Sequence, residues 1–446
     1  MAKWQNWART VKHTGLEKVY EPKNLNELKS AVKQAANRGW KLRAVGSGHA
    51  WSNLGVPSRC GGAVILTERL DKILSSPDDP TAGGIVEVQG GITIKRLNNE
   101  LFKLGLALDN MGDSNPQALA GAIATETHGS GAGIGSISEF VEGMTIVKGD
   151  GETHVLEGDE LKAGRVARGQ LGAVYSVKLR VRPKYFLHHE QVLVKLRDDN
   201  IPELIKSRHL EYWYYPYTGM AERITREITD STTEINPLDI GEEWFIKIGA
   251  ALVNAMGKNN PQKLPGFWKD HAKEKFFPRV ERQGPSHKIL LGKSNVWRDV
   301  VRTFTMEYQL DIGSGLDNFW KAVDAFDESV SVAEKKCVFV ASPVQIRFTK
   351  KSDKSLLSHL RHQPTASFSI SFFRDHDGAH TWLPDLERRL RALGGRPHWG
   401  KMYYVEPEAT PESNAFEAIR QSLDPTGVFN FRQGAYTPDP EAFQGP

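Results

Sequence analysis

The chain has 446 residues, of which 39% are hydrophobic and 25% are charged, and its formal net charge at pH 7 is +4. These values are typical of a soluble globular protein, and the length predicts two or three domains. No Lys/Arg run could follow a nucleic-acid backbone, and no apolar run approaches the roughly 18 residues that cross a bilayer, so we expect neither a nucleic-acid partner nor a membrane span.

The two cysteines, Cys60 and Cys337, lie far apart in the sequence and form no Cys-x-x-Cys pattern. Their placement argues against a disulfide scaffold, a zinc site and a redox dithiol. Residues 1–15 lack the apolar stretch of a secretory signal. We therefore expect a cytoplasmic enzyme.

The first 180 residues alternate between helix and strand patterns. Residues 24–39 predict a helix, because Asn24 can cap its start, Glu27 follows three residues later and Gly39 can end it. The same pattern recurs over residues 93–105. Short strands are expected over 41–46, 62–67, 84–91 and 172–183, and a hairpin over 142–156 around Gly-Asp-Gly.

The pattern changes after Pro183 and predicts a second, mostly antiparallel α+β domain. Strand-like runs cover 211–217, 335–348 and 367–373, and helix-like runs cover 316–329 and 382–395. The last residues are rich in Gly and Pro, and we expect them to return to the first domain. The predicted division is therefore 1–183, 184–400 and 401–446.

Two glycine-rich segments lie in the first domain: RAVGSGHAWSNL, at 43–54, and the stretch 110–136. Successive small residues free backbone N–H groups to surround a pyrophosphate. Neither segment has the Gly-Lys-Ser/Thr of a P-loop or a Rossmann Gly-x-Gly-x-x-Gly between strand and helix. Either segment alone could be a structural turn, but together they favour a dinucleotide held by a non-Rossmann domain.

Five segments occur in the order and spacing of one flavoprotein family: RAVGSGHAWSNL, AGAIATETHGSGAG, MEYQLD at 306–311, PVQIRF at 343–348 and PHWGK at 397–401. The chain resembles the sugar-1,4-lactone oxidases (D-arabinono- and L-gulono-1,4-lactone oxidases) and alditol oxidases of the vanillyl-alcohol-oxidase group, over nearly its whole length. The resemblance implies an α+β fold with a non-Rossmann, PCMH-type FAD-binding domain and an antiparallel-sheet substrate domain that caps the flavin.

The resemblance also implies a role for His49. In this family the histidine after the glycine turn bonds covalently to the 8α-methyl of FAD, and imidazole is a suitable nucleophile. The alternative is a solvent-facing loop histidine. The residues expected at the cofactor are Gly46, Ser47, Gly48, His49, Ala50, Ser114, Gly121, Thr125, His128, Gly129, Ser130 and Gly131.

The reaction that the resemblance implies is oxidation of an alcohol carbon by hydride transfer to flavin N5. Arg347 and Lys401 would stabilise negative charge on the substrate oxygen, and His398 would be either a base or a packed histidine. The family's usual Pro-Val-Glu-x-Arg has Gln345 here in place of the glutamate. Because glutamine is uncharged, we expect a more electropositive site that prefers an acidic or electron-withdrawing substrate.

Three functions therefore stay open. The first is FAD-dependent oxidation of a sugar lactone or polyol, with O2 as acceptor and hydrogen peroxide as product. The second is a dehydrogenase of the same family with another electron acceptor. The third is a non-catalytic flavin-binding protein, which the joint presence of His49, Arg347 and Lys401 disfavours. No metal site is expected, since the pair His376 and His380 lies in a turn-like segment.

Overall fold

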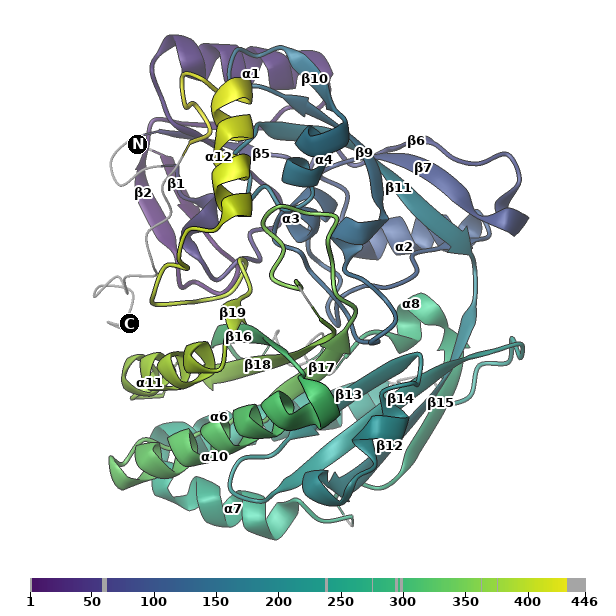
Figure 1. Ribbon diagram of the computed structural model, residues 1–446, viewed down its shortest axis with the longest axis vertical. Coiled ribbons are helices and arrows are strands. Elements are labelled where there is room, and N and C mark those ends of the chain that lie inside the picture. The colour runs from purple at the N-terminus through teal and green to yellow at the C-terminus, as the bar shows by residue number, and fades with distance from the viewer. Residues whose placement is uncertain are drawn as a thin grey trace.

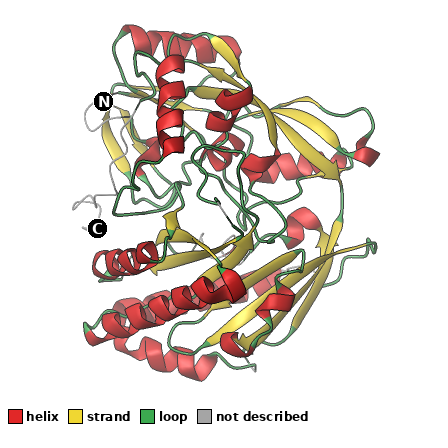
Figure 2. Ribbon diagram, in the orientation of Figure 1, coloured by secondary structure: helices red, strands yellow, loops and turns green. Residues whose placement is uncertain are grey.

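The computed structural model describes residues 2–57, 62–236, 240–274, 276–292, 296, 300–361, 363–374 and 376–430. Cys60 and residues 431–446 of the predicted C-terminal segment lie outside the described residues. Figure 1 shows an upper and a lower lobe, and the chain passes between them from β11 (Ala173–Pro183) to β12 (Phe186–Lys195). Both lobes mix helices and strands (Figure 2), which confirms the predicted α+β class.

The upper lobe contains a small parallel sheet with the order β3 (Lys18–Tyr20), β5 (Ala63–Leu66), β4 (Leu42–Val45). Helix α1 (Leu25–Asn37) connects β3 to β4. Its predicted start is confirmed, because Asn24 Oδ1 accepts the N–H of Glu27 at 3.0 Å. Its end is confirmed at Gly39, whose φ of +67° is a conformation that glycine adopts easily.

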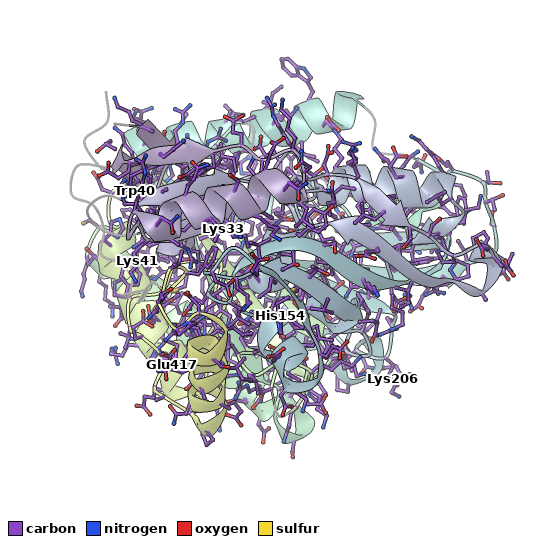
Figure 3. The ribbon with its side chains drawn as sticks, turned by 90° about the horizontal axis from the view of Figure 1, so that it is seen from above. Lys33, Trp40, Lys41, His154, Lys206 and Glu417 are labelled. Atoms are coloured by element: carbon purple, nitrogen blue, oxygen red, sulfur yellow. The ribbon has the colours of Figure 1, made fainter. Side chains whose placement is uncertain are left out.

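A larger antiparallel sheet completes the strand framework of the upper lobe. Its order is β10 (Thr153–Leu156), β9 (Val141–Val147), β11, β7 (Gly84–Gln89) and β6 (Ile73–Ser75), with β8 (Leu106–Ala107) on the end of β11. The predicted hairpin over 142–156 is confirmed as β9 and β10. From above (Figure 3), Lys33 projects from α1, and its Nζ pairs with Glu152 Oε1 of this hairpin at 2.6 Å.

The remaining upper elements are the hairpin of β1 (Ala2–Gln5) and β2 (Lys12–Leu16) and the helices α2 (Ile94–Lys103), α3 (Leu119–Ala124) and α4 (Gly158–Gly164). The predicted second helix is confirmed as α2, which Thr93 caps. Near the C-terminal end of the described chain, α12 (Pro411–Leu423) lies against α4 and so belongs to the upper lobe (Figure 1).

The lower lobe is built on an antiparallel sheet, with eight strands among the described residues. The order is β15 (Val280–Pro285), β12, β14 (Met220–Thr229), β13 (His209–Tyr214), β17 (Val344–Thr349), β18 (Thr365–Phe373), β16 (Thr303–Asp311) and β19 (Arg396–Pro397). The expected antiparallel second sheet is therefore confirmed.

Helices cover the lower sheet on the side away from the upper lobe: α5 (Ile201–Leu204), α6 (Ile240–Asn259), α7 (Leu264–His271), α10 (Asp317–Lys335) and α11 (Ala379–Ala392) (Figure 1). The short helix α8 (Ser286–Ile289) lies on the side of the upper lobe, and its Ile289 packs into the upper core. Phe319 and Phe326 of α10 and Trp382 of α11 share one core with the apolar strand residues. In the described part of the chain, no helix combines the length and apolarity that spanning a bilayer requires.

The structure corrects one predicted strand. Residues 335–348 read as a single strand, but α10 continues to Lys335, and β17 begins only at Val344. The helix continues because Val330 and Ala333 still face the core, and Cys337, with a φ of +58°, then reverses the chain.

Candidate active site

The central strands of the lower sheet have two buried faces of opposite character. Successive strand residues point to opposite faces. On β16, the residues Phe304, Met306, Tyr308 and Leu310 pack into the helix-covered core, whereas Thr303, Thr305, Glu307 and Gln309 lie on the other face and are equally buried. β17 repeats this alternation with Gln345, Arg347 and Thr349. The polar face meets the upper lobe, because Arg347 Nη1 donates to His128 O at 3.0 Å.

A cavity of about 1240 Å³, open space at its mouth included, lies between this polar face and the upper lobe. We name it the interlobe cavity. The upper lobe lines it with the glycine turn after β4 and with parts of the segment 110–136. The lower lobe and the segment after β19 line it with Glu307, Arg347, His398, Gly400 and Lys401.

The upper wall of the interlobe cavity offers polar atoms that suit the expected FAD. Gly46 lets the glycine turn lie close to Ala118, because a Cβ at position 46 would lie 2.2 Å from Ala118 Cβ. Ser47 Oγ and Gln117 Oε1 are buried and, within the described residues, have no hydrogen-bond partner. Buried polar atoms rarely stay unpaired, so these two atoms are suited to bind a ligand that enters the cavity.

His49 lines the interlobe cavity at the glycine turn. Its ring stacks on Trp7, with centroids 5.1 Å apart and planes 22° apart. The Trp7 N–H donates to Gly48 O at 2.9 Å, and Arg302 lies over the Trp7 ring at 4.6 Å. The turn therefore holds the imidazole in a defined position at the cavity.

Arg43, in strand β4 just before the glycine turn, fixes the surrounding backbone. Its buried guanidinium donates to Leu54 O at 2.7 Å, Gly169 O at 3.1 Å and Arg168 O at 2.5 Å. Burial, reinforced by the charge of Arg168, lowers the pKa of Arg43 to about 10, so the group stays cationic at neutral pH.

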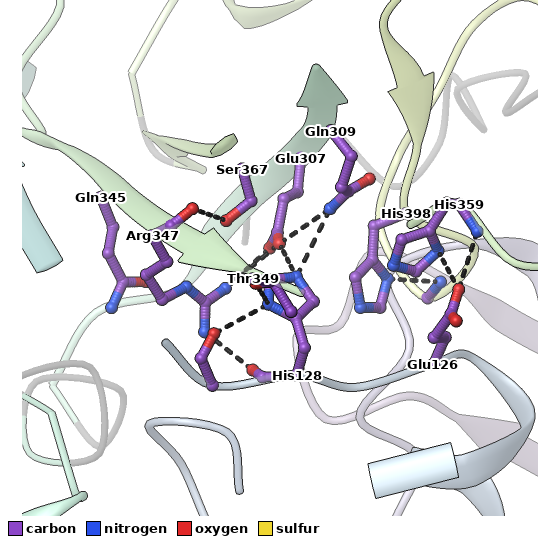
Figure 4. Close-up of polar contacts among 12 residues, drawn as sticks. Glu126, His128, Glu307, Gln309, Gln345, Arg347, Thr349, His359, Ser367 and His398 are labelled. Atoms are coloured by element: carbon purple, nitrogen blue, oxygen red, sulfur yellow. Dashed lines mark hydrogen bonds and ion pairs between the residues drawn. The ribbon is translucent and has the colours of Figure 1, made fainter. Parts of the chain in front are cut away.

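Glu307 is the centre of the polar network on the lower side of the cavity (Figure 4). Its Oε1 lies 2.7 Å from His128 Nε2, and Arg347 Nη2 donates to both carboxylate oxygens at 3.1 and 3.2 Å. Gln309 Nε2 donates to Oε1 at 3.1 Å. Burial is the largest single effect and would raise the pKa of Glu307, but Arg347 and His128 together outweigh it and hold the pKa well below its usual range. The carboxylate is therefore ionised and keeps Arg347 fixed.

His398 and Lys401 lie beside this network. Burial, with the charge of Lys401, lowers the pKa of His398 to about 3, so the ring is neutral. Gly400 N–H donates to His398 Nδ1 at 3.0 Å, so the neutral ring carries its proton on Nε2. Lys401 Nζ lies over the Trp51 ring at 4.0 Å, and burial lowers its pKa. Among the described residues, no carboxylate forms an ion pair with Lys401.

His128, His359 and His398 form a cluster whose ring nitrogens lie within 4.8 Å of one another. Three imidazoles can bind a transition metal when each offers a lone pair. Here His398 Nδ1 already accepts a backbone N–H, and both nitrogens of His128 face oxygen atoms, on Gly129 and Glu307. This hydrogen bonding opposes a metal site at the cluster.

Gln345 lies outside the cavity lining, and its surroundings add negative charge to the expected electropositive site. Its Nε2 donates to Asp113 Oδ2 at 2.9 Å and to Glu211 Oε1 at 2.8 Å. Glu211 Oε2 in turn accepts from Arg226 at 3.1 Å. The glutamine thus joins two carboxylates, and Asp113 supplies negative charge at the cavity itself. This charge opposes the binding of an acidic substrate, whose preference by this site stays a prediction.

The structure brings most of the predicted site residues to the interlobe cavity. The cavity lining includes Arg347, Lys401, His398, Gly46, Ser47, Gly48, His49, Ala50, Gly121, Thr125 and His128. Ser114, Gly129, Ser130 and Gly131 do not line it, so their roles at a cofactor stay predictions. Gly129 has a packing role, because a Cβ there would lie 2.3 Å from Asn110 Oδ1.

Two lining residues, Glu307 and Asp113, were given no role by the sequence reasoning. Glu307 belongs to the quoted segment MEYQLD, in which polar and apolar residues alternate. That alternation is normally typical of a half-exposed strand, so it did not indicate a buried carboxylate. Asp113 follows Gly112 in the glycine-rich segment, where an acid is also a common turn residue.

Comparisons with known proteins agree with this geometry. A family model described as D-arabinono-1,4-lactone oxidase matches residues 177–435, and one described as FAD binding domain matches residues 17–157. An L-gulono-1,4-lactone dehydrogenase from Mycobacterium tuberculosis is 28% identical over 439 residues, with 96% of each chain covered. The L-gulonolactone oxidase of Mus musculus is 26% identical over 456 residues, again with 96% of each chain covered.

Solved structures give the same fold. A solvent-stable cholesterol oxidase superposes with a TM-score of 0.79 and covers 96% of both chains, at 18% sequence identity. At that identity the likeness concerns the fold alone.

Proposed function

This chain belongs to the D-arabinono-1,4-lactone oxidase family, as its sequence predicted, and from that premise we propose that it oxidises a CH–OH group of a sugar lactone or polyol. The match to the FAD binding domain identifies FAD as the cofactor. When bound, FAD supplies the acceptor for the two electrons and the hydrogen removed from the substrate carbon. One observation carries the proposal: Arg347, Lys401 and the glycine turn with His49 all line the interlobe cavity.

Lys401 is the group that we assign to take the hydroxyl proton, at Nζ. Burial lowers its pKa, so its neutral form is easier to reach than in water. His398 is less suited to this role, because its Nδ1 lone pair already accepts the Gly400 N–H. Arg347 supplies positive charge for the developing oxygen anion, and Glu307 holds the guanidinium in place.

His49 is the residue that we propose to carry FAD covalently. Its support is its place on the cavity wall and its fixed stacking on Trp7. Acid precipitation tests the bond: yellow colour should stay with the wild-type protein and pass into the supernatant for His49→Ala. Colour in the supernatant of both proteins would contradict the covalent bond and leave FAD binding intact.

Oxidase activity is tested by mixing the purified protein, without oxygen, with neutral lactones and polyols. Bleaching of the flavin band near ~450 nm would show substrate oxidation. Lys401→Met should keep the flavin and lose the bleaching, whereas Lys351→Met, at an exposed position, should behave as wild type. A yellow protein that no neutral substrate bleaches would overturn the proposed function.

The electron acceptor separates two candidates, since one relative is named an oxidase and another a dehydrogenase. We propose O2 as the acceptor. Admitting air to the bleached protein should restore the colour within seconds and release hydrogen peroxide. Colour that returns only with an added electron carrier would instead identify a dehydrogenase.

A further inference from the structure

Asp113 brings a carboxylate to the wall of the interlobe cavity, in the part lined by Glu307, Arg347 and Lys401. The negative charge of Asp113 acts on both Arg347 and Lys401 and favours their cationic forms. The Asp113 Oδ2 atom accepts from Gln345 Nε2 at 2.9 Å, so the side chain is held from the sheet beneath it. Asp113 therefore combines a fixed position with access to the cavity.

Gln345 is the group that makes this arrangement possible. Its Nε2 donates to both carboxylates. Because ionised carboxylates only accept hydrogen bonds, the NH2 side of the amide must face Asp113 and Glu211. A glutamate at position 345 would bring a third carboxylate into hydrogen-bond distance of these two, with no proton between them. The glutamine is thus matched to its neighbours and is not the remnant of a lost active site.

Asp113 and Glu211 differ in their position relative to the interlobe cavity. Glu211 is 2% exposed, does not line the cavity, and also accepts from Trp213 Nε1 at 2.8 Å and Arg226 Nη1 at 3.1 Å. Its negative charge is therefore paired within the lower lobe. Of the two carboxylates that Gln345 joins, Asp113 is the one that borders the space a substrate would occupy.

We propose that Asp113 is the substrate-binding carboxylate of this site, which accepts hydrogen bonds from hydroxyl groups of a neutral polyhydroxylated substrate and excludes sugar acids. The assignment rests on the proposed function. A carboxylate accepts strong hydrogen bonds from hydroxyl groups. It also repels a substrate carboxylate, since Arg347 is already paired with Glu307.

Asp113→Asn tests the assignment with little change in shape. The asparagine oxygen can still accept from Gln345 while its NH2 faces the cavity. KM for neutral lactones and polyols should rise about tenfold or more, with kcat within about threefold of wild type. The preference for a neutral substrate over the matching aldonic acid, as a ratio of kcat/KM, should fall by about 30-fold or more.

Two further variants serve as controls for the effect of Asp113→Asn. Asp353→Asn makes the same chemical change at an exposed position and should leave both constants unchanged. Asp113→Glu keeps the charge and moves it by one methylene, so it should retain the discrimination against aldonic acids with an intermediate KM. Flavin content and thermal midpoint, measured for every variant, show that the fold is kept.

The outcomes distinguish a wrong assignment of Asp113 from a wrong proposed function. If wild type oxidises neutral substrates and Asp113→Asn leaves KM and the neutral-to-acid ratio within about twofold, the assignment of Asp113 is wrong and the proposed function stands. If wild type oxidises only aldonic acids, the assignment is wrong as well. If wild type oxidises neither class although it holds FAD, the proposed function fails, and the role of Asp113 fails with it.

Discussion

At the scale of single residues, the site depends on one buried carboxylate. Glu307 is fully buried and contacts His128, Arg347 and Gln309, so a change there alters three partners at once. A charged group in such a position stabilises the fold only while its partner is present. A substitution of Glu307 should therefore affect both the stability of the fold and the proposed catalytic role of Arg347.

We expect Glu307→Gln to destabilise the protein and to impair catalysis together. Removing the negative charge leaves the buried guanidinium of Arg347 without its ion pair, which should lower the free energy of unfolding by about 3 kcal/mol. Urea unfolding of the flavin-loaded protein measures this effect. As a control, Glu412→Gln breaks the more exposed pair with Arg361 and should cost less than about 1 kcal/mol. Equal losses in the two variants would contradict the role of Glu307.

Glu126 makes the stability depend on pH. Its carboxylate accepts from Ser358 Oγ and His359 N–H, each at 2.7 Å, but burial outweighs these bonds and raises its pKa to about 7. The folded state thus binds this proton more tightly than the unfolded state. The destabilising contribution of Glu126 therefore grows as pH rises from the ordinary carboxyl pKa, near ~4.5, to about 7.

Glu126→Gln removes this titration. The stability of the variant relative to wild type should increase between pH 5 and pH 8, by up to about 3 kcal/mol, because the shift is roughly 2.5 pH units. Unfolding midpoints measured at several pH values in that range test the prediction. Parallel curves for variant and wild type would contradict it.

At the residue scale, membership of the cavity lining could be predicted where a segment resembles a known family. His49, Arg347 and Lys401 stand in segments that resemble one family, and all three line the interlobe cavity. The roles of Glu307 and Asp113 depend on contacts between residues far apart in the chain, such as Asp113 with Gln345. No local pattern encodes those contacts.

At the scale of elements, a local signal decides where α1 begins. Asn24 Oδ1 caps α1 through the Glu27 N–H, whereas Asn200 precedes α5 without a side-chain cap bond. Asn24→Ala should therefore lower the free energy of unfolding by about 1 kcal/mol, and Asn200→Ala should cost less. Thermal or urea unfolding of both variants provides the comparison, and equal effects would contradict the capping role.

Elements with strong local signals were predicted correctly, including α1, α2 and the β9–β10 hairpin. The run 335–348 was predicted wrongly as one strand, because the packing of Val330 and Ala333 extends α10 to Lys335 and Cys337, with a φ of +58°, then turns the chain before β17 begins. Tertiary contacts decided the end of that helix, and they are not readable from a short window.

At the scale of the whole molecule, the proposed function places FAD in the interlobe cavity, where it would join the contact between the lobes. A ligand that binds only the folded protein stabilises it. His49→Ala, stripped of its flavin, should therefore unfold at a lower temperature than the same variant with FAD restored. Differential scanning calorimetry measures the difference, and equal midpoints would show that FAD does not join the two lobes.

The two-lobe arrangement could be predicted from the change in sequence pattern after Pro183, together with the family resemblance. The division into 1–183, 184–400 and 401–446 stays a prediction, although α12 does lie with the upper lobe. The interlobe cavity itself could not be predicted, because it exists only where the polar face of β16 and β17 meets the glycine turn.

The contacts beside the His49 turn also bear on the time course of folding. Trp51 N–H donates to Gly400 O at 2.8 Å, and Ser52 Oγ donates to Trp399 O at 2.8 Å across 347 residues of chain. Such long-range contacts are slow to form and require that nearly the whole chain has been synthesised. A ribosome-bound chain that ends before Trp399 can fold its N-terminal helices and strands, but its flavin site would still be open. In the proposed function, cofactor capture therefore requires a chain that has been synthesised at least to Gly400.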